Sequence, residues 1–127
     1  MATAAPHRPA SFNVVTATPH DGLFLVEVEG ELDAPDRSRW TGIFNEAIKD
    51  GATGIAVDLR GCHAVDYSCL SVLLATSVAL KARGGGGVSL VTTPGSLLER
   101  TVRASTVDEL PAYPSATEAL HSLEDAE

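Results

Sequence analysis

The sequence predicts an α/β fold: a mixed, mostly parallel β-sheet with an antiparallel hairpin strand at its N-terminal side and about four helices packed on it. Two observations carry this prediction. Short apolar segments alternate with amphipathic helical segments between residues 23 and 123, and this order gives parallel strands joined by right-handed crossovers. Before them, two strand-like segments are separated only by a turn, which is the pattern of a hairpin.

The length and composition fit one domain. The chain has 127 residues, of which 44% are hydrophobic and 5% aromatic, so the core should consist of Val, Leu, Ile and Ala. We expect residues 1–10 to be a disordered lead-in, residues 11–123 to form the domain and residues 124–127 to be an acidic tail.

The N-terminal part predicts a hairpin followed by a helix. Residues 11–17 and 23–28 are the expected strands, and a turn rich in Pro, Asp and Gly separates them. Apolar residues then recur at helical spacing over residues 34–50. Asp33 precedes this segment as its expected N-cap, and Gly51 ends it.

The rest of the chain alternates strand and helix. The expected strands are residues 54–59 and 88–92, with a short extended piece within 107–113. The expected helices are residues 66–83, 94–104 and 115–123, and Ser115 with Glu118 forms a capping box before the last of them. Four glycines at residues 84–87 follow a helix and precede a strand. A phosphate cradle has the opposite order, so these glycines predict a helix stop.

Composition narrows the possible partners and the compartment. The formal net charge is −8 at pH 7, which argues against nucleic acid or an anionic membrane as a partner. Two cysteines and four scattered histidines make neither a disulfide framework nor a zinc site, so we expect no metal and no cofactor. Without a signal-like or membrane-spanning apolar run, we expect a cytoplasmic protein with reduced thiols.

The helix expected at residues 66–83 has two faces of different character. Its apolar stripe should face the sheet and consists of Leu70, Leu73, Leu74 and Leu80, with Val78 at the margin. Its other stripe is small and uncharged and consists of Ser68, Ser71, Ala75, Ala79 and Ala82. This second stripe fits either a helix wedged within its own fold or a docking face for another protein. Asp66 is the expected N-cap.

Two chemical interpretations of this helix start are open. A phosphate on Ser68 would meet free amides and the positive end of the helix dipole, so the fold would tolerate it while a partner on the small face would be expelled. Alternatively, Cys69 could be the nucleophile of a small thiol enzyme with His63 as base. The negative charge of Asp66 disfavours the required thiolate.

The chain resembles the STAS domain of bacterial anti-sigma factor antagonists over roughly residues 12–123. The resemblance rests on G-E-L-D at 30–33, on A-V-D-L-R-G-C-H-A-V-D-Y-S-C-L-S-V-L-L at 56–74, on the glycine-rich link before V-S-L-V, and on P-G-S-L-L-E-R-T-V-R-A-S-T-V-D-E-L at 94–110. It implies a STAS-like version of the predicted sheet. It also implies a binding module with no catalytic residues of its own.

The resemblance further implies a switch. Family members bind an anti-sigma factor that is also an ATP-dependent serine kinase, which frees a sigma factor; phosphorylation ends the complex and a phosphatase resets it. The phosphoacceptor falls on Ser68. The implied partner-binding residues are Asp33, Asp66, Tyr67, Ser68, Cys69, Ser71, Val72 and Ala75. Tyr67 and Cys69 stand where small serine and glycine are common, which keeps open an unphosphorylated STAS scaffold in a larger signalling or transport assembly.

Overall fold

Five strands form one sheet in the computed structural model, which describes residues 12–106 and 109–124. The strands are β1 (Phe12–His20), β2 (Leu23–Leu32), β3 (Gly54–Val65), β4 (Gly87–Val91) and β5 (Ala112–Tyr113). The helices are a 3₁₀ turn η1 (Ala34–Asp36) and α1 (Arg37–Lys49), α2 (Tyr67–Ala82), α3 (Leu97–Thr106) and α4 (Ala116–Glu124). The expected lead-in at residues 1–10 lies outside the described residues, as do residues 125–127 of the expected acidic tail.

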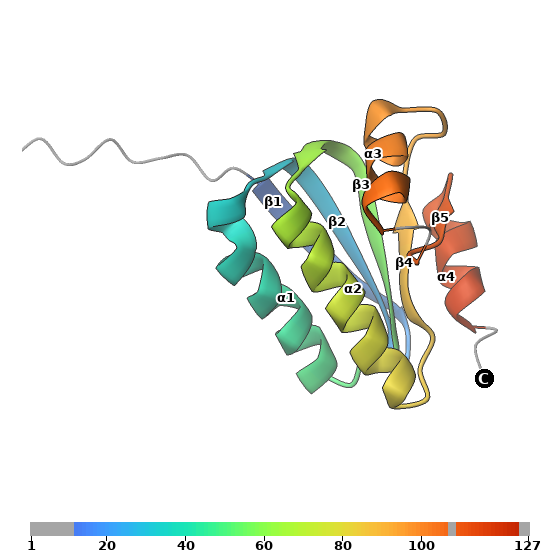
Figure 1. Ribbon diagram of the computed structural model, residues 1–127. Helices are drawn as coiled ribbons and strands as arrows, with labels where there is room; N and C mark the ends of the chain where they lie inside the picture. Colours follow the sequence, from blue (N-terminus) through green and yellow to red (C-terminus); the bar gives the residue numbers. More distant parts are fainter. Residues whose placement is uncertain (1–11, 107–108, 125–127) are drawn as a thin grey trace, which may run out of the picture.

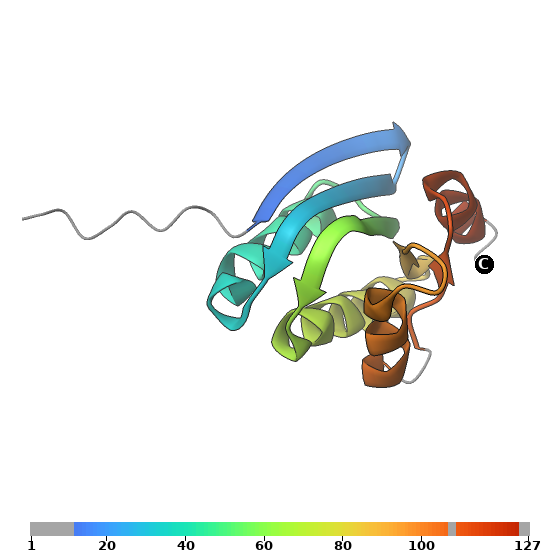
Figure 2. The ribbon, with the colours of Figure 1, turned by 90° about the horizontal axis from the view of Figure 1, so that it is seen from above.

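The strand order in the sheet is β1-β2-β3-β4-β5 (Figure 1). β1 and β2 are antiparallel, and every other neighbouring pair is parallel. The mixed, mostly parallel sheet with an N-terminal hairpin is therefore confirmed. Figure 2 shows α1, α2 and α3 on one side of the sheet and α4 on the other, an arrangement that the order of elements did not determine.

Both faces of the sheet carry a core. The larger core lies between the sheet and the layer of α1, α2 and α3, and β4 contributes only buried residues. A smaller core lies under α4. It consists of Leu23, Ala56, Val91, Ala119 and Leu123. Burial on both faces explains why the parallel strands are nearly continuous apolar runs.

Three strands are longer than the sequence indicated. β2 was expected to end at residue 28 but continues to Leu32, paired with β3. β3 was expected to end at residue 59 but continues to Val65. Register shifts between Glu27 and Glu29 and between Gly30 and Glu31 each leave one extra residue on β3, as in a β-bulge. At the first shift, the Arg60 N–H donates to the Asp58 carboxylate at 3.0 Å. β1 also extends to His20, because the hairpin turn is only two residues long and Gly22 supplies its positive φ of 80°.

Two helix starts differ from the prediction. Asp33 is the expected N-cap, but the first turn is 3₁₀: the Asp36 N–H donates to the Asp33 carbonyl at 2.9 Å. Pro35 lies in that turn. The third helix was expected from Pro94 but begins at Leu97. There the Ser96 hydroxyl accepts the Glu99 N–H at 3.1 Å, which makes Ser96 the effective cap.

The glycines after α2 end the helix, as predicted. The Gly85 N–H donates to the Leu80 carbonyl and the Gly86 N–H to the Thr53 carbonyl, both at 2.9 Å. A Cβ at Gly85 would lie 2.1 Å from the Thr53 oxygen, so the chain passes too closely for any side chain. Because these amides already bond to carbonyls, they do not form an anion cradle.

Candidate functional site

The candidate site lies where β2 and β3 end at one edge of the sheet. Leu32 and Val65 are paired, and Asp33 and Asp66 directly follow them. The Asp66 N–H donates to the Leu32 carbonyl at 2.7 Å, which ties the start of α2 to the end of β2. The structure therefore brings Asp33 and Asp66 to the same edge, as expected from parallel strands.

Asp66 caps α2 and holds Ser68 at the same time. Its Oδ2 accepts the Ser68 N–H at 2.8 Å and the Ser68 hydroxyl at 2.5 Å. The hydroxyl bond, with the backbone bond, lowers the pKa of Asp66 below its usual value. The carboxylate is thus ionised at neutral pH and fixes the direction of the Ser68 O–H.

Ser68 lies at the accessible N-terminal end of α2. It is half-buried, whereas the neighbouring Tyr67 side chain is 61% exposed. One turn further along the helix, the Ser71 hydroxyl donates to the Ser68 carbonyl at 2.8 Å. The Ser71 hydroxyl is thus engaged by the helix itself, while the Ser68 hydroxyl is held by a side chain at the edge of the sheet.

Cys69 is a packing residue. Its side chain is fully buried, and its Sγ lies 3.6 Å from the Asp33 carbonyl oxygen. Burial raises the pKa of the Cys69 thiol, and the charges of Asp66, Asp36 and Asp33 raise it further. Among the described residues no hydrogen bond joins His63 to this thiol. A buried thiol with a raised pKa is a poor nucleophile, so the geometry gives the thiol-enzyme hypothesis no support.

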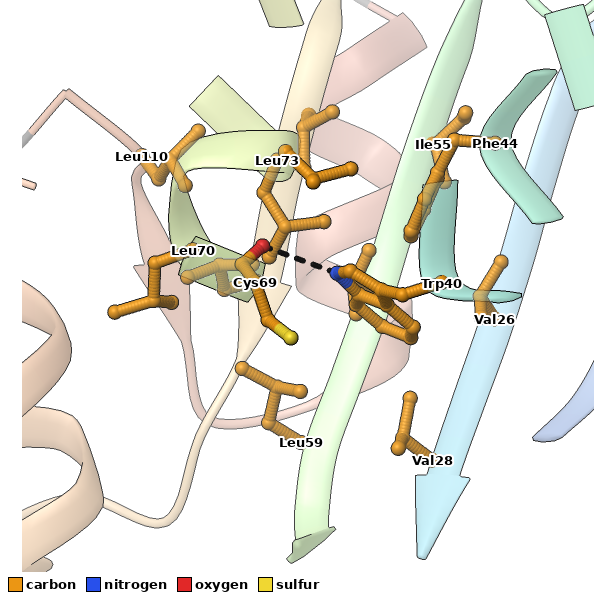
Figure 3. Packing of buried hydrophobic residues seen from close by; sticks show 14 of the residues in the cluster. Val26, Val28, Trp40, Phe44, Ile55, Leu59, Cys69, Leu70, Leu73 and Leu110 are labelled. Carbon is orange, nitrogen blue, oxygen red and sulfur yellow. Dashed lines mark hydrogen bonds between the residues drawn. The ribbon is translucent and has the colours of Figure 1, made fainter. Parts of the chain in front are cut away.

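Trp40 is a site-supporting residue that the sequence analysis did not single out. Its indole N–H donates to the Cys69 carbonyl at 3.0 Å, which joins α1 to the first turn of α2 (Figure 3). Trp40 is fully buried and packs edge-to-face on Phe12 and Phe44, with ring centroids 5.8 and 4.7 Å away. A lone Trp on the apolar face of a predicted helix needs a partner for its N–H, and this was the available signal.

The two faces of α2 differ in part from the prediction. Leu70, Leu73 and Leu80 are buried against the sheet as expected. Val78 was placed at the margin of that stripe, but its side chain is 66% exposed. Its helical position explains this, because Val78 lies eleven residues after Tyr67, which is close to three full turns. Both side chains therefore point away from the sheet.

The expected partner-binding residues fall into two groups. Asp33, Asp66, Tyr67 and Ser68 lie at the sheet edge, with Ser71 and Ala75 further along the accessible side of α2. Cys69 and Val72 are buried, with Val72 8% exposed. These two support the surface from beneath and offer little of it directly.

Neither a metal site nor a membrane span is found in the described part of the chain. Within residues 12–106 and 109–124, no group of His, Cys, Asp and Glu is arranged to hold a metal ion. Over the same residues, each helix is too short or too polar to span a bilayer.

Comparison with known families and structures decides the family. The family model described as "Mlab, STAS domain" matches residues 16–112. This chain belongs to the STAS domain family. No curated protein sequence matches the chain.

Solved structures share the STAS fold at low sequence identity. An anti-sigma factor antagonist from Mycobacterium paratuberculosis is 22% identical, with a TM-score of 0.72 over 97% of this chain and 100% of that chain. SpoIIAA in its unphosphorylated form is 17% identical, with a TM-score of 0.67 over 84% of this chain and 92% of that chain. The phosphorylated form of SpoIIAA, a Bacillus cell fate determinant, is 16% identical, with a TM-score of 0.62 over 86% of this chain and 97% of that chain.

Proposed function

We propose that this STAS protein is a cytoplasmic anti-sigma factor antagonist without catalytic activity of its own. It binds a partner anti-sigma factor that is also a serine kinase, releases a sigma factor, and is switched by phosphorylation at Ser68. One observation carries the proposal: Asp66 holds the Ser68 hydroxyl at an accessible helix start, beside an uncharged exposed face of α2. The general role is also that named for structures with the same fold.

The proposed chemistry takes place on Ser68 Oγ. The kinase transfers the γ-phosphoryl group of ATP: a bond forms between Oγ and phosphorus, the bond to the ADP oxygen breaks, and the hydroxyl proton leaves to a base of the kinase. Asp66 positions the hydroxyl. The product phosphate lies near the first-turn amides and the positive end of the α2 dipole, so the fold tolerates it.

The same phosphate would end the complex. It adds a bulky dianion at the start of the docking face, next to the ionised Asp66 carboxylate. A partner packed there loses its fit and meets new negative charge, while α2 stays folded. A phosphatase then restores the binding form by hydrolysing the phosphate ester. Asp33 and Tyr67 contact the partner at the edge, and Cys69 and Val72 act through packing.

The test is incubation with the anti-sigma kinase from the same genome and ATP, followed by mapping of the phosphate by mass spectrometry. Phosphate is expected on Ser68. Ser68→Asp should weaken kinase binding at least roughly tenfold, a size usual for a charge placed in an interface, whereas Ser68→Ala should bind as the wild type does. Modification at another residue, no modification by a bound and active kinase, or equal binding by Ser68→Asp and Ser68→Ala would contradict the proposal.

The exposed ring of Tyr67 favours a second candidate, an unphosphorylated scaffold in a larger signalling or transport assembly. A tyrosine that is 61% exposed beside Ser68 crowds an approaching kinase loop but suits a permanent anchor in an interface. This candidate predicts stable co-purification with a partner that lacks kinase activity. It also predicts that Tyr67→Ala, and not Ser68→Asp, abolishes the complex.

A further inference from the structure

The accessible side of α2 is apolar although nothing in the described chain covers it. Tyr67 and Val78 are 61% and 66% exposed, and Ala75 between them is exposed as well. The opposite side of the same helix is buried against the sheet. A helix that is apolar all round is normally buried all round, and an exposed apolar strip of this kind marks an interaction surface.

A groove of about 240 Å³ runs beside this strip, between α1 and α2. Its α2 wall includes Ser71, Ala75 and Ala79, whose spacing of four leaves a furrow of the kind that receives the side-chain ridge of another helix. We call the exposed strip and this groove together the α1–α2 face. It runs in the direction of two adjacent helices (Figure 1), so its shape suits a helical occupant.

The charged side chains along the α1–α2 face are positive, apart from the acids at the sheet edge. Arg37 is the charged residue among those lining the groove, and no ion pair of Arg37 occurs within residues 12–106 and 109–124. Lys81 and Arg83 are exposed at the far end of α2, and the sequence of this helix contains no acid. This differs from the whole chain, whose net charge is −8.

The one acid within α1, Glu46, lies on its other side. Glu46 is seven residues from Arg39, and this spacing of nearly two turns puts both on one side of the helix. Arg39 faces β1, where its guanidinium donates to the Phe12 carbonyl at 2.9 Å and lies 4.1 Å from the Phe12 ring centroid. The α1–α2 face therefore combines apolar surface with cations, apart from the acids at the sheet edge itself.

We propose that the α1–α2 face binds an acidic, apolar-faced helix of the partner, with apolar side chains in the groove and carboxylates opposite Arg37 and Arg83. This inference rests on the proposed function, because it names the segment by which the anti-sigma partner docks. It also gives the Ser68 phosphate a second effect: a dianion at one end of the face repels an acidic helix along it.

Two synthetic helical peptides test the inference without the partner. Both carry leucines at i, i+4, i+7 and i+11; one has glutamates on its flanks and the other has lysines. With isotope-labelled protein, the glutamate peptide should shift amide signals of α1 and α2 and should bind roughly tenfold more tightly than the lysine peptide. Arg37→Glu should weaken the glutamate peptide about fivefold or more. Arg100→Glu, which changes the net charge equally on α3, should stay within about twofold.

Three results would overturn the inference: shifts confined to other surfaces, no shift at millimolar peptide, or a lysine peptide that binds as tightly as the glutamate peptide. A second experiment measures binding of the anti-sigma kinase to the wild type and to Arg37→Glu. If the kinase binds the wild type and Arg37→Glu equally, the docking segment is wrong although the proposed function stands. If it does not bind the wild type at all, the proposed function fails, and the peptide result alone decides whether the α1–α2 face accepts an acidic helix.

Discussion

Replacing Trp40 by Phe should loosen the support beneath the Ser68 edge. The indole N–H donates to the Cys69 carbonyl at 3.0 Å, and the side chain is fully buried between α1 and α2. Phe retains an aromatic ring in contact with Phe12 and Phe44 but has no donor and a smaller volume. The change therefore removes one buried hydrogen bond and leaves a small cavity without altering charge.

The expected loss can be worked out from these two parts. A buried carbonyl that loses its donor costs about 1 kcal/mol, and the smaller ring adds about 1–2 kcal/mol through lost contacts and the cavity. The free energy of unfolding should fall by about 2–3 kcal/mol, which for a domain of this size lowers Tm by about 10 °C.

The assay is urea unfolding followed by far-UV circular dichroism, because the substitution removes the only tryptophan of the chain. The midpoint should fall while the m-value stays unchanged. Tyr67→Phe is the matched control: it also removes a polar group from an aromatic ring, but at an exposed position, so its effect should stay below about 0.5 kcal/mol. A change for Trp40→Phe as small as that of the control would refute the argument that this hydrogen bond and packing hold α1 to α2.

Three further predictions concern other parts of the fold. Gly85→Ala should lower the free energy of unfolding by about 2 kcal/mol, because the added Cβ has no room. The control Gly42→Ala has open space within α1 and should raise the free energy of unfolding by about 1 kcal/mol. Equal effects of the two substitutions would contradict the steric account. Burial raises the pKa of both Cys62 and Cys69, so neither thiol should react with an aromatic disulfide reagent at pH 8 until the protein is unfolded; rapid labelling of the native protein would be inconsistent with this burial. The lowered pKa of Asp66 gives a stabilisation that is complete above its ordinary pKa of about 3.9 and is lost as pH falls through the lower folded value. The difference in unfolding free energy between wild type and Asp66→Asn, measured in urea at several pH values, should thus be constant from pH 7 to about pH 5 and should close below about pH 4; a difference that persists in acid would argue against the charge as its source.

Local signals were sufficient for most of the fold. Strand and helix segments alternate clearly, Gly22 and Gly51 mark chain reversals, and Asp66 stands where a cap is needed, so the hairpin, the parallel order and the start of α2 are confirmed. The extent of β3 was wrong, because bulges interrupt the two-residue period on which strand prediction relies. The position of α4 on the opposite face depends on long-range packing that no local pattern encodes.

The position of the candidate site could be predicted from the sequence, but the exposure of some of its side chains could not. Parallel strands that end together put Asp33 and Asp66 at one edge, and this is confirmed. The exposure of Val78 was missed because this residue was grouped with the leucines that face the sheet, although its spacing from Tyr67 puts it on the opposite side of α2. Burial of Val72 was missed because α1 covers a side of α2 that the sequence alone does not assign. The roles of Ser68 and its neighbours stay predictions until the kinase is tested.

The hydrogen bond between Trp40 and Cys69 also makes Trp40 an intrinsic fluorescence probe of the start of α2. The chain has one tryptophan, so its fluorescence comes from a single buried indole whose N–H is bonded to the carbonyl of the residue after Ser68. Its emission wavelength and intensity depend on that bond and on the exclusion of water around the ring. Any event that shifts the first turn of α2, whether docking or phosphoryl transfer, can therefore be followed in unlabelled protein by the light this one side chain emits.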